Sequence, residues 1–172
     1  MKKNFQPSRS HIALIALGGN VDNPREHLEN ALEKMRSREG WQILARSSWR
    51  ITKPVGFLEQ PDFVNGAVAI GVPAEFSPEN LMQKLLQIEI EEGRVRPKPM
   101  NDGPRSCDLD LLFFDDETRD SELLQLPHPR WRERAFVLEP LIEVLEQLGG
   151  NAKLLAQAKS ALEKLNVPYF VK

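Results

Sequence analysis

The sequence predicts an α+β fold in which helices pack on a mostly antiparallel sheet. Short apolar or alternating runs, typical of strands, enclose two segments of helical periodicity in the order β-α-β-β-α-β. Two further helical segments follow this core, and helices grouped against an antiparallel sheet are a common α+β arrangement. The 172 residues, 41% of them hydrophobic, are enough for one compact domain, so we assign residues 1–172 to a single domain.

The core is predicted to begin with a buried strand and a helix. Residues 11–17 form a nearly continuous apolar run, which predicts a strand buried on both faces, and the glycines at 18–19 are predicted to allow a tight turn after it. Asn23, Pro24 and Glu26 then combine a cap side chain, a proline at the first helical position and a capping-box acid. A helix is therefore predicted to begin there.

The middle of the core is predicted to hold two strands and the second helix. Residues 41–51 alternate imperfectly, as a half-buried strand does, and two prolines and a glycine interrupt the pattern over residues 52–61. Residues 63–72 are strand-like again. Ser77, followed by a proline, opens a helix that we expect to end near Gly93, a residue suited to a left-handed cap.

The last strand and the C-terminal helices complete the predicted fold. Residues 108–114 predict a strand, and residues 123–126 a short extension or a hairpin partner. Residues 135–148 and 152–165 predict helices separated by two glycines. The order of elements indicates a ferredoxin-like βαββαβ core with the C-terminal helices as additions.

Composition excludes several classes of protein. A net charge of -2 gives no basic field for a nucleic-acid backbone, and no apolar run approaches the roughly 18 residues of a membrane span. Cys107 is the only cysteine, so an intramolecular disulfide is excluded, and the first residues show no signal-peptide pattern. We therefore expect a cytoplasmic protein that binds neither nucleic acid nor membranes.

Asp108 and Asp110 are candidates for a metal site. Because side chains alternate along a strand, both carboxylates share one face, roughly 7 Å apart at the α-carbons, while Leu109 points the other way. Oxygen ligands of this kind suit Mg²⁺, which takes one or two carboxylates and completes its shell with water and phosphate oxygens. The alternative is a pair of exposed acids at the start of a strand.

Arginines flank the acidic strand on both sides. Arg94, Arg96 and Arg105 precede it, and the basic segment 127–134 follows it. Guanidinium groups match phosphate oxygens bidentately, so arginines around a pair of magnesium-binding acids predict a site for a polyphosphate. The alternative is a solvated basic loop. The sequence has no P-loop motif, and no spacing of Ser, His and Asp indicates a nucleophile.

A second group of residues is suited to an aromatic heterocycle. Asn65 carries both a donor and an acceptor, so it could read the edge of a ring while Phe63 or Phe136 stacks on the face of that ring. Each residue also has a simpler explanation, with Asn65 at a strand end and the two phenylalanines in the core.

Four sequence blocks, taken in order, resemble one known family. The blocks are Ala16-Leu-Gly-Gly-Asn20; Pro54-Val-Gly56 with Gln60-Pro-Asp-Phe-Val-Asn65; Glu89 through Gly93-Arg-Val-Arg96 with Gly103-Pro-Arg-Ser-Cys-Asp-Leu-Asp110; and Pro127-His-Pro129 with Arg134-Ala-Phe-Val-Leu138. Over about residues 11–145 the chain resembles 6-hydroxymethyl-7,8-dihydropterin pyrophosphokinase of folate biosynthesis. The resemblance implies the ferredoxin-like fold and a transferase that moves the pyrophosphoryl group of ATP to the pterin hydroxymethyl group and releases AMP.

The resemblance also implies roles for the candidate residues. Asp108 and Asp110 match ligands of two Mg²⁺ ions that bridge the triphosphate of the co-substrate ATP. Arg94 and Arg105 match arginines that contact the phosphates and stabilise charge during transfer. The matching ATP-binding residues are Glu89, Arg94, Arg96, Arg105, His128 and Arg134, and the matching pterin-binding residues are Thr52, Val55, Phe63, Asn65 and Phe136.

Residues 97–102 depart from the family pattern. Two prolines and Met100 stand where the family commonly has basic residues and a tryptophan, so we expect slower closure over the substrates or weaker pterin capture. A degenerate relative that binds nucleotide or pterin without turnover is therefore the alternative to an enzyme. A βαββαβ nucleic-acid-binding module is disfavoured, because residues 108–114 lack its basic and aromatic pattern.

Two further expectations concern the rest of the molecule. Residues 149–172 lie outside the four blocks, and their apolar positions suit a covering helix better than a cofactor site. We expect a monomer that acts on small molecules, with a homodimer as the alternative.

Overall fold

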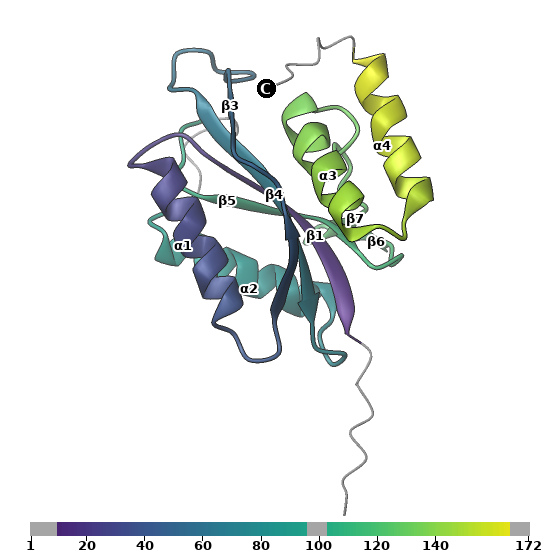
Figure 1. Ribbon diagram of the computed structural model, residues 1–172. Helices are drawn as coiled ribbons and strands as arrows, with labels where there is room; N and C mark the ends of the chain where they lie inside the picture. The colour runs from purple at the N-terminus through teal and green to yellow at the C-terminus, as the bar shows by residue number, and fades with distance from the viewer. Residues whose placement is uncertain (1–9, 96–102, 166–172) are drawn as a thin grey trace, which may run out of the picture.

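The computed structural model describes residues 10–95 and 103–165, and Figure 1 shows how the elements are arranged. In chain order these elements are β1 (His11–Gly19), α1 (Pro24–Arg36), β2 (Gln42–Arg46), β3 (Arg50–Thr52), β4 (Phe63–Val72), α2 (Pro78–Glu91), β5 (Asp108–Phe114), β6 (Arg119–Asp120), β7 (Gln125–Leu126), α3 (Ala135–Leu148) and α4 (Ala152–Lys164).

The main sheet is antiparallel, with the strand order β2-β4-β1-β5, and the short strand β3 also pairs with β4. The central position of β1 agrees with its apolar sequence, because a strand with two neighbours and two covered faces meets little water. Strands β6 and β7 form a separate hairpin, so of the two alternatives for residues 123–126 the structure has the hairpin partner, limited to residues 125–126. The predicted α+β fold with a βαββαβ core is confirmed.

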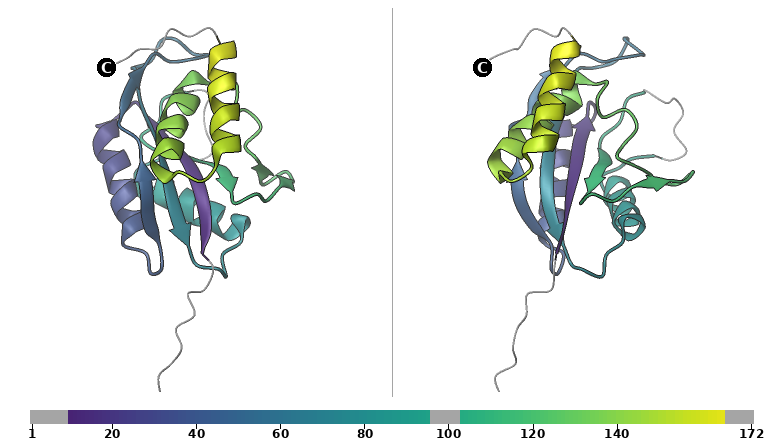
Figure 2. Two further views of the ribbon diagram at one scale, coloured as in Figure 1. Left: turned by 45° about the vertical axis from the view of Figure 1, so that its right-hand side comes forward. Right: turned by 90° about the vertical axis from the view of Figure 1, so that its right-hand side faces the viewer.

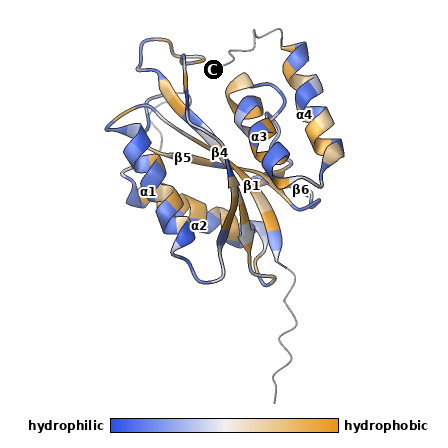
Figure 3. Cartoon of the chain, viewed as in Figure 1, coloured by the Kyte–Doolittle hydropathy of each residue, from blue (hydrophilic) through white to orange (hydrophobic). Residues whose placement is uncertain are grey.

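Helices cover both faces of the main sheet. Ala13, Ile15 and Leu17 of β1 belong to one buried cluster with α1 and α2, whereas Leu14 and Ala16 belong to a second cluster with α3 and α4. The alternation of side chains along the strand separates these two sets. Figures 1 and 2 show the two helix pairs on opposite sides of the sheet, and Figure 3 shows hydrophobic strands beside helices that also carry hydrophilic residues. Within residues 10–95 and 103–165, no helix is long and apolar enough to cross a bilayer.

The two core helices begin differently. The capping box predicted for α1 is wrong, because Asn23 has a left-handed backbone with φ 59° and its side chain makes no cap hydrogen bond. Pro24 still starts the helix, and its missing N–H leaves one amide fewer to satisfy. Helix α2 does have a reciprocal cap: the Ser77 hydroxyl accepts from the Asn80 amide, and the Asn80 side chain accepts from the Ser77 amide.

The single strand predicted over residues 41–51 is two strands. Between β2 and β3, the Ser47 backbone N–H donates to the Ala67 carbonyl at 2.9 Å, and the Ser47 hydroxyl accepts from the Ala67 N–H at 2.9 Å. A side chain therefore replaces one backbone group of the ladder. The neighbouring Trp49 ring lies over Gly66, where an added Cβ would come within 2.6 Å of the ring. This local packing interrupts the strand.

Helix α3 also contacts the edge of the sheet at the end of β2. The Gln147 side chain accepts from the Arg46 N–H at 3.3 Å and donates to the Arg46 carbonyl at 2.8 Å. Glu143, one turn earlier, accepts from the N–H of Ser48 at 2.9 Å. Backbone groups on the outer side of this strand are thus paired with side chains of the same molecule.

Candidate active site

Asp108 and Asp110 lie on the same face of β5. Leu109 points into the core and is 1% exposed, while both aspartates line a cavity beside the start of α3. Arg105, Arg134 and Phe136 are among the other residues around this cavity. The described residues contain no cluster of three or more His, Cys, Asp or Glu side chains suited to a metal ion. A cation here would therefore combine two carboxylates with oxygens from water or a ligand.

Two arginines hold the Asp108 carboxylate. One oxygen, Oδ1, pairs with Arg94, and the other, Oδ2, lies 3.0 Å from Nε of Arg105. Each carboxylate oxygen has two lone pairs, so Asp108 can keep these partners and still offer an oxygen to a cation. The ligands offered here are the carboxylate oxygens of Asp108 and Asp110, and oxygen ligands suit Mg²⁺.

Glu89 and Arg94 lie beneath β5. Glu89 is 1% exposed; it accepts from the Leu109 N–H at 2.8 Å and pairs with Arg94 at 2.8 Å. Burial disfavours the charge on Arg94 and so lowers the pKa of the guanidinium. The negative charges of Asp108 and Glu89 outweigh this effect, and the pKa lies above its ordinary value. Neither Glu89 nor Arg94 is among the described residues that line this cavity or the adjoining one described next.

The aromatic and amide residues form a second, adjoining cavity. Its lining residues are Thr52, Lys53, Val55, Phe63, Asn65, Arg105, Arg130, Arg134 and Phe136. Asn65 is 5% exposed and donates from Nδ2 to the Thr52 hydroxyl at 2.6 Å. The Arg105 guanidinium lies 4.9 Å from the centre of the Phe63 ring, and that of Arg134 lies 5.6 Å from the centre of Phe136. Each of the two phenylalanine rings therefore has one guanidinium group over it.

Gly18 lines the cavity of the two aspartates and separates Asp108 from Asn65. It lies between Asn65 of β4 and Asp108 of β5 in the strand register, and an added Cβ would come within 2.8 Å of the Asn65 Oδ1 atom. The prediction of a tight turn at residues 18–19 is wrong, since both glycines belong to β1. Glycine is needed here for space: at Gly19 a Cβ would come within 2.4 Å of the Ser106 carbonyl oxygen.

His128 lies close to this site without lining the two cavities described above. Its Nδ1 accepts from the Arg130 N–H at 3.1 Å, which requires that nitrogen to be unprotonated. Burial lowers the pKa of His128, the Arg134 charge acts in the same direction, and Asp108 opposes them. The imidazole therefore favours its neutral form.

The structure brings most of the predicted residues together. Thr52, Val55, Phe63, Asn65, Arg105, Asp108, Asp110, Arg134 and Phe136 all line one of the two cavities. Arg96 and the atypical segment 97–102 lie outside the described residues. Lys53 and Arg130 also line the cavity that contains Phe63 and Phe136, and they were not predicted from the sequence. Their positions in the proline-containing segment 52–61 and the basic segment 127–134 were the available signals.

Comparison with known proteins gives the family. The sequence model of the 7,8-dihydro-6-hydroxymethylpterin-pyrophosphokinase (HPPK) family matches residues 14–146. The chain belongs to this family. A Synechocystis relative named 2-amino-4-hydroxy-6-hydroxymethyldihydropteridine pyrophosphokinase is 38% identical over 138 residues, or 80% of this chain and 68% of the relative. A Bacillus subtilis relative of the same name is 37% identical over 143 residues, or 83% of each chain.

Solved structures show the same fold. A Plasmodium falciparum HPPK-DHPS, determined with pterin and p-hydroxybenzoate, matches with a TM-score of 0.60 at 16% identity. The match covers 92% of this chain and 44% of that chain. The predicted pyrophosphokinase family is confirmed, and with it the predicted transferase activity in folate biosynthesis.

Proposed function

We propose that this pyrophosphokinase transfers the pyrophosphoryl group of ATP to 6-hydroxymethyl-7,8-dihydropterin in the two adjoining cavities. One observation carries the proposal: the acid pair and the amide–aromatic group meet across Gly18. Groups suited to a phosphate chain therefore face groups suited to a heterocycle, and a substrate of each kind would be held with its reactive end toward the other.

Asp108 and Asp110 would hold Mg²⁺ with the triphosphate, and we propose two ions at this pair. When bound, the cations would neutralise and orient the phosphate oxygens. The arrangement supports this role because both carboxylates line the same cavity as Arg105 and Arg134. These guanidinium groups can donate to phosphate oxygens on the side away from the acids.

The aromatic cavity would hold the pterin. Phe136 and Phe63 offer ring faces, and the Asn65 Nδ2 donates to Thr52 while Oδ1 is directed toward Gly18. That oxygen can accept a hydrogen bond from a ring N–H or an exocyclic amine. The fixed orientation of the Asn65 amide favours a ligand edge that donates at this point.

The reaction requires positioning and charge stabilisation. The pterin hydroxymethyl oxygen bonds to the β-phosphorus, the bond from this phosphorus to the oxygen of the α-phosphate breaks, AMP departs with that oxygen, and the hydroxyl proton passes to water. Arg105 lies where both cavities meet, so its guanidinium can stabilise the charge on the transferred group.

Arg94 and Glu89 act from below the strand. Their ion pair lies behind Asp108, so we propose that they set the position of its carboxylate. For Arg94 to contact the phosphates, as the family resemblance implies, it would exchange Asp108 for a phosphate oxygen. His128, close to Asp108 and Arg134, belongs on the ATP side as well.

The test is formation of AMP from ATP. We expect AMP release to require both Mg²⁺ and the hydroxymethyl pterin, and Asp108→Asn and Asp110→Asn each to lower kcat by at least about 100-fold because the phosphates lose their anchor. Asp116→Asn, an exposed carboxylate after β5, is the matched control and should retain wild-type turnover. AMP release without pterin, or full activity of both cavity variants, would overturn the proposal.

The cellular location, the oligomeric state and the number of domains are also proposals. We propose a cytoplasmic monomer of one domain, supported by the lone Cys107 and by the paired backbone groups at the end of β2. Size-exclusion chromatography with light scattering would measure the oligomeric state, and a concentration-dependent mass near twice that of the chain would contradict a monomer.

A further inference from the structure

Asn20 connects two segments that carry residues of the site. It follows Gly19 at the end of β1 and is 3% exposed. On one side its Nδ2 donates to the Gln60 side-chain oxygen and to the Pro61 carbonyl, both at 2.9 Å. On the other side its Oδ1 accepts from the Arg105 N–H at 3.0 Å, and its own N–H donates to the Arg105 carbonyl at 2.9 Å.

These contacts fix the Arg105 backbone from both sides. The N–H and the carbonyl of one residue are bonded to the same asparagine, so the direction in which the Arg105 side chain leaves the backbone is set by Asn20. The guanidinium then reaches the Phe63 ring at 4.9 Å and the Asp108 carboxylate at 3.0 Å. Arg105 thus contacts a residue of each cavity.

The other contacts of Asn20 hold the segment that leads into β4. Pro61 lies two residues before Phe63, and Gln60 in turn donates from Nε2 to the Phe57 carbonyl at 2.7 Å. Phe63 and Asn65, which line the aromatic cavity, follow directly along the chain. One buried amide therefore holds the pterin-side segment and the phosphate-side arginine in a fixed relation.

Asparagine suits this position for a chemical reason. The amide presents one acceptor to an N–H and two donor hydrogens to two oxygens, so its donors and its acceptor all face suitable groups. An aspartate has the same shape but no donor, and would place a negative oxygen against two carbonyl-type oxygens. The substitution Asn20→Asp therefore removes the hydrogen bonds to Gln60 and Pro61 and keeps the acceptor for the Arg105 N–H.

We infer that Asn20 is a positioning residue of this enzyme, which acts through Arg105 by fixing it relative to the pterin-side segment. The inference rests on the proposed function. A displacement of a catalytic group by about 1 Å can reduce turnover about 100-fold, so loss of Asn20 should appear in kcat.

A double-mutant cycle separates positioning from simple stabilisation. We expect Asn20→Ala to lower kcat at least about tenfold, and the Asn20→Ala, Arg105→Ala double variant to be no slower than Arg105→Ala alone, because a residue that acts through Arg105 has no effect once that side chain is absent. Fold reductions in kcat that multiply in the double variant would overturn the inference.

Further variants keep the test decisive. Asn20→Asp should raise the KM for the pterin more than the KM for Mg-ATP, because it loses only the contacts to residues 60–61. If Asn20→Ala does not fold, the same cycle with Gln60→Ala, which removes one partner of the amide, decides in the same way. Gln125→Ala, an exposed amide on β7, should leave kcat unchanged. An inactive wild-type enzyme would contradict the proposed function, whereas an active one with independent effects would contradict only the role of Asn20.

Discussion

Arg105 contacts both an aromatic ring and an acid, and so joins the two halves of the site. Arg105→Ala is expected to lower kcat by about 1000-fold while the KM for Mg-ATP changes little, because the charge is needed most in the transition state. Arg105→Lys should recover only part of the activity, since an ammonium group lacks the planar fork of a guanidinium. Steady-state kinetics of both variants tests this, and wild-type turnover in Arg105→Ala would contradict it.

Cys107 is fully buried directly before the acidic strand. Burial raises the pKa of its thiol, and the charges of Glu89 and Asp108 raise it further. Since only the thiolate attacks disulfide reagents, we expect no reaction of the native protein with an aromatic disulfide at pH 8, and stoichiometric reaction in urea. Rapid labelling of the folded chain would show that the thiol is accessible.

At the residue scale the sequence predicted which side chains gather around the two cavities better than it predicted the detailed contacts between them. The alternation of Asp108 and Asp110 places both acids on one side of a strand, and this follows from the pattern alone. The need for glycine at residue 18 depends on which strands lie beside β1 and in which register, because the crowding atom belongs to Asn65. The burial of Arg94 likewise depends on how α2 lies beneath β5.

Helix α2 supports the site through its last turn. Glu89→Gln would leave the buried Arg94 charge with only part of its compensation, so we expect a loss of about 3 kcal/mol in the free energy of unfolding. The Glu89→Gln, Arg94→Met double variant should recover part of this loss, because the buried guanidinium charge is then absent and Asp108 keeps its ion pair with Arg105. Urea denaturation measures both, and a double variant less stable than Glu89→Gln would contradict the explanation.

At the element scale, most helices and strands could be predicted, and the exceptions have physical causes. Strong apolar periodicity predicted β4, α2 and α3, and Ser77 predicted the start of α2. The break between β2 and β3 depends on a serine hydroxyl in place of a backbone group and on the Trp49 ring over Gly66. These contacts join residues far apart in the sequence, so a local pattern does not contain them.

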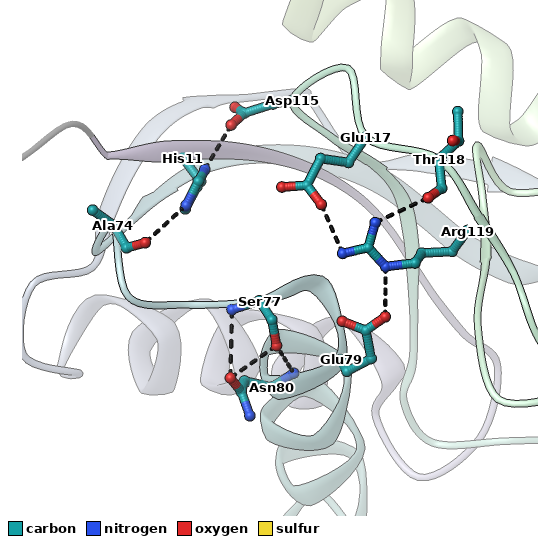
Figure 4. A network of polar contacts seen from close by, with 9 residues as sticks. All are labelled: His11, Ala74, Ser77, Glu79, Asn80, Asp115, Glu117, Thr118 and Arg119. Carbon is teal, nitrogen blue, oxygen red and sulfur yellow. Dashed lines mark hydrogen bonds and ion pairs between the residues drawn. The ribbon is translucent and has the colours of Figure 1, made fainter.

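A polar network outside the two cavities of the site connects several elements, as Figure 4 shows. His11 of β1 lies between two acceptors, with Nδ1 2.7 Å from the Asp115 carboxylate and Nε2 3.0 Å from the Ala74 carbonyl. Only the protonated ring donates from both nitrogens. Nearby, Arg119 pairs with Glu79 of α2 and with Glu117.

This network predicts a dependence of stability on pH. The hydrogen bond to Asp115 raises the pKa of His11, burial opposes the shift, and the Ala74 carbonyl and the charges of Asp115 and Glu117 support it. Because the folded pKa lies above the unfolded value of about 6.5, the contribution is complete below that pH and is lost as the pH rises through the folded pKa. The contribution should be modest, since water screens this partly exposed pair.

The comparison with His11→Gln isolates the effect. Between pH 6 and pH 8 the wild-type free energy of unfolding should fall relative to that of the variant, as measured by urea denaturation at constant ionic strength. Parallel pH profiles for the two proteins would show that His11 titrates no differently in the folded and unfolded states.

For the whole molecule, the order of strands and helices was sufficient to predict the architecture, but contacts across the edge of the sheet were not visible in the sequence. Gln147 occupies both backbone groups of Arg46, so an incoming peptide finds no amide–carbonyl pair there with which to extend the sheet. This protection comes from a side chain of α3, outside the strand it guards. At high protein concentration, fibre-like self-association by strand addition is therefore blocked at this position of the sheet edge.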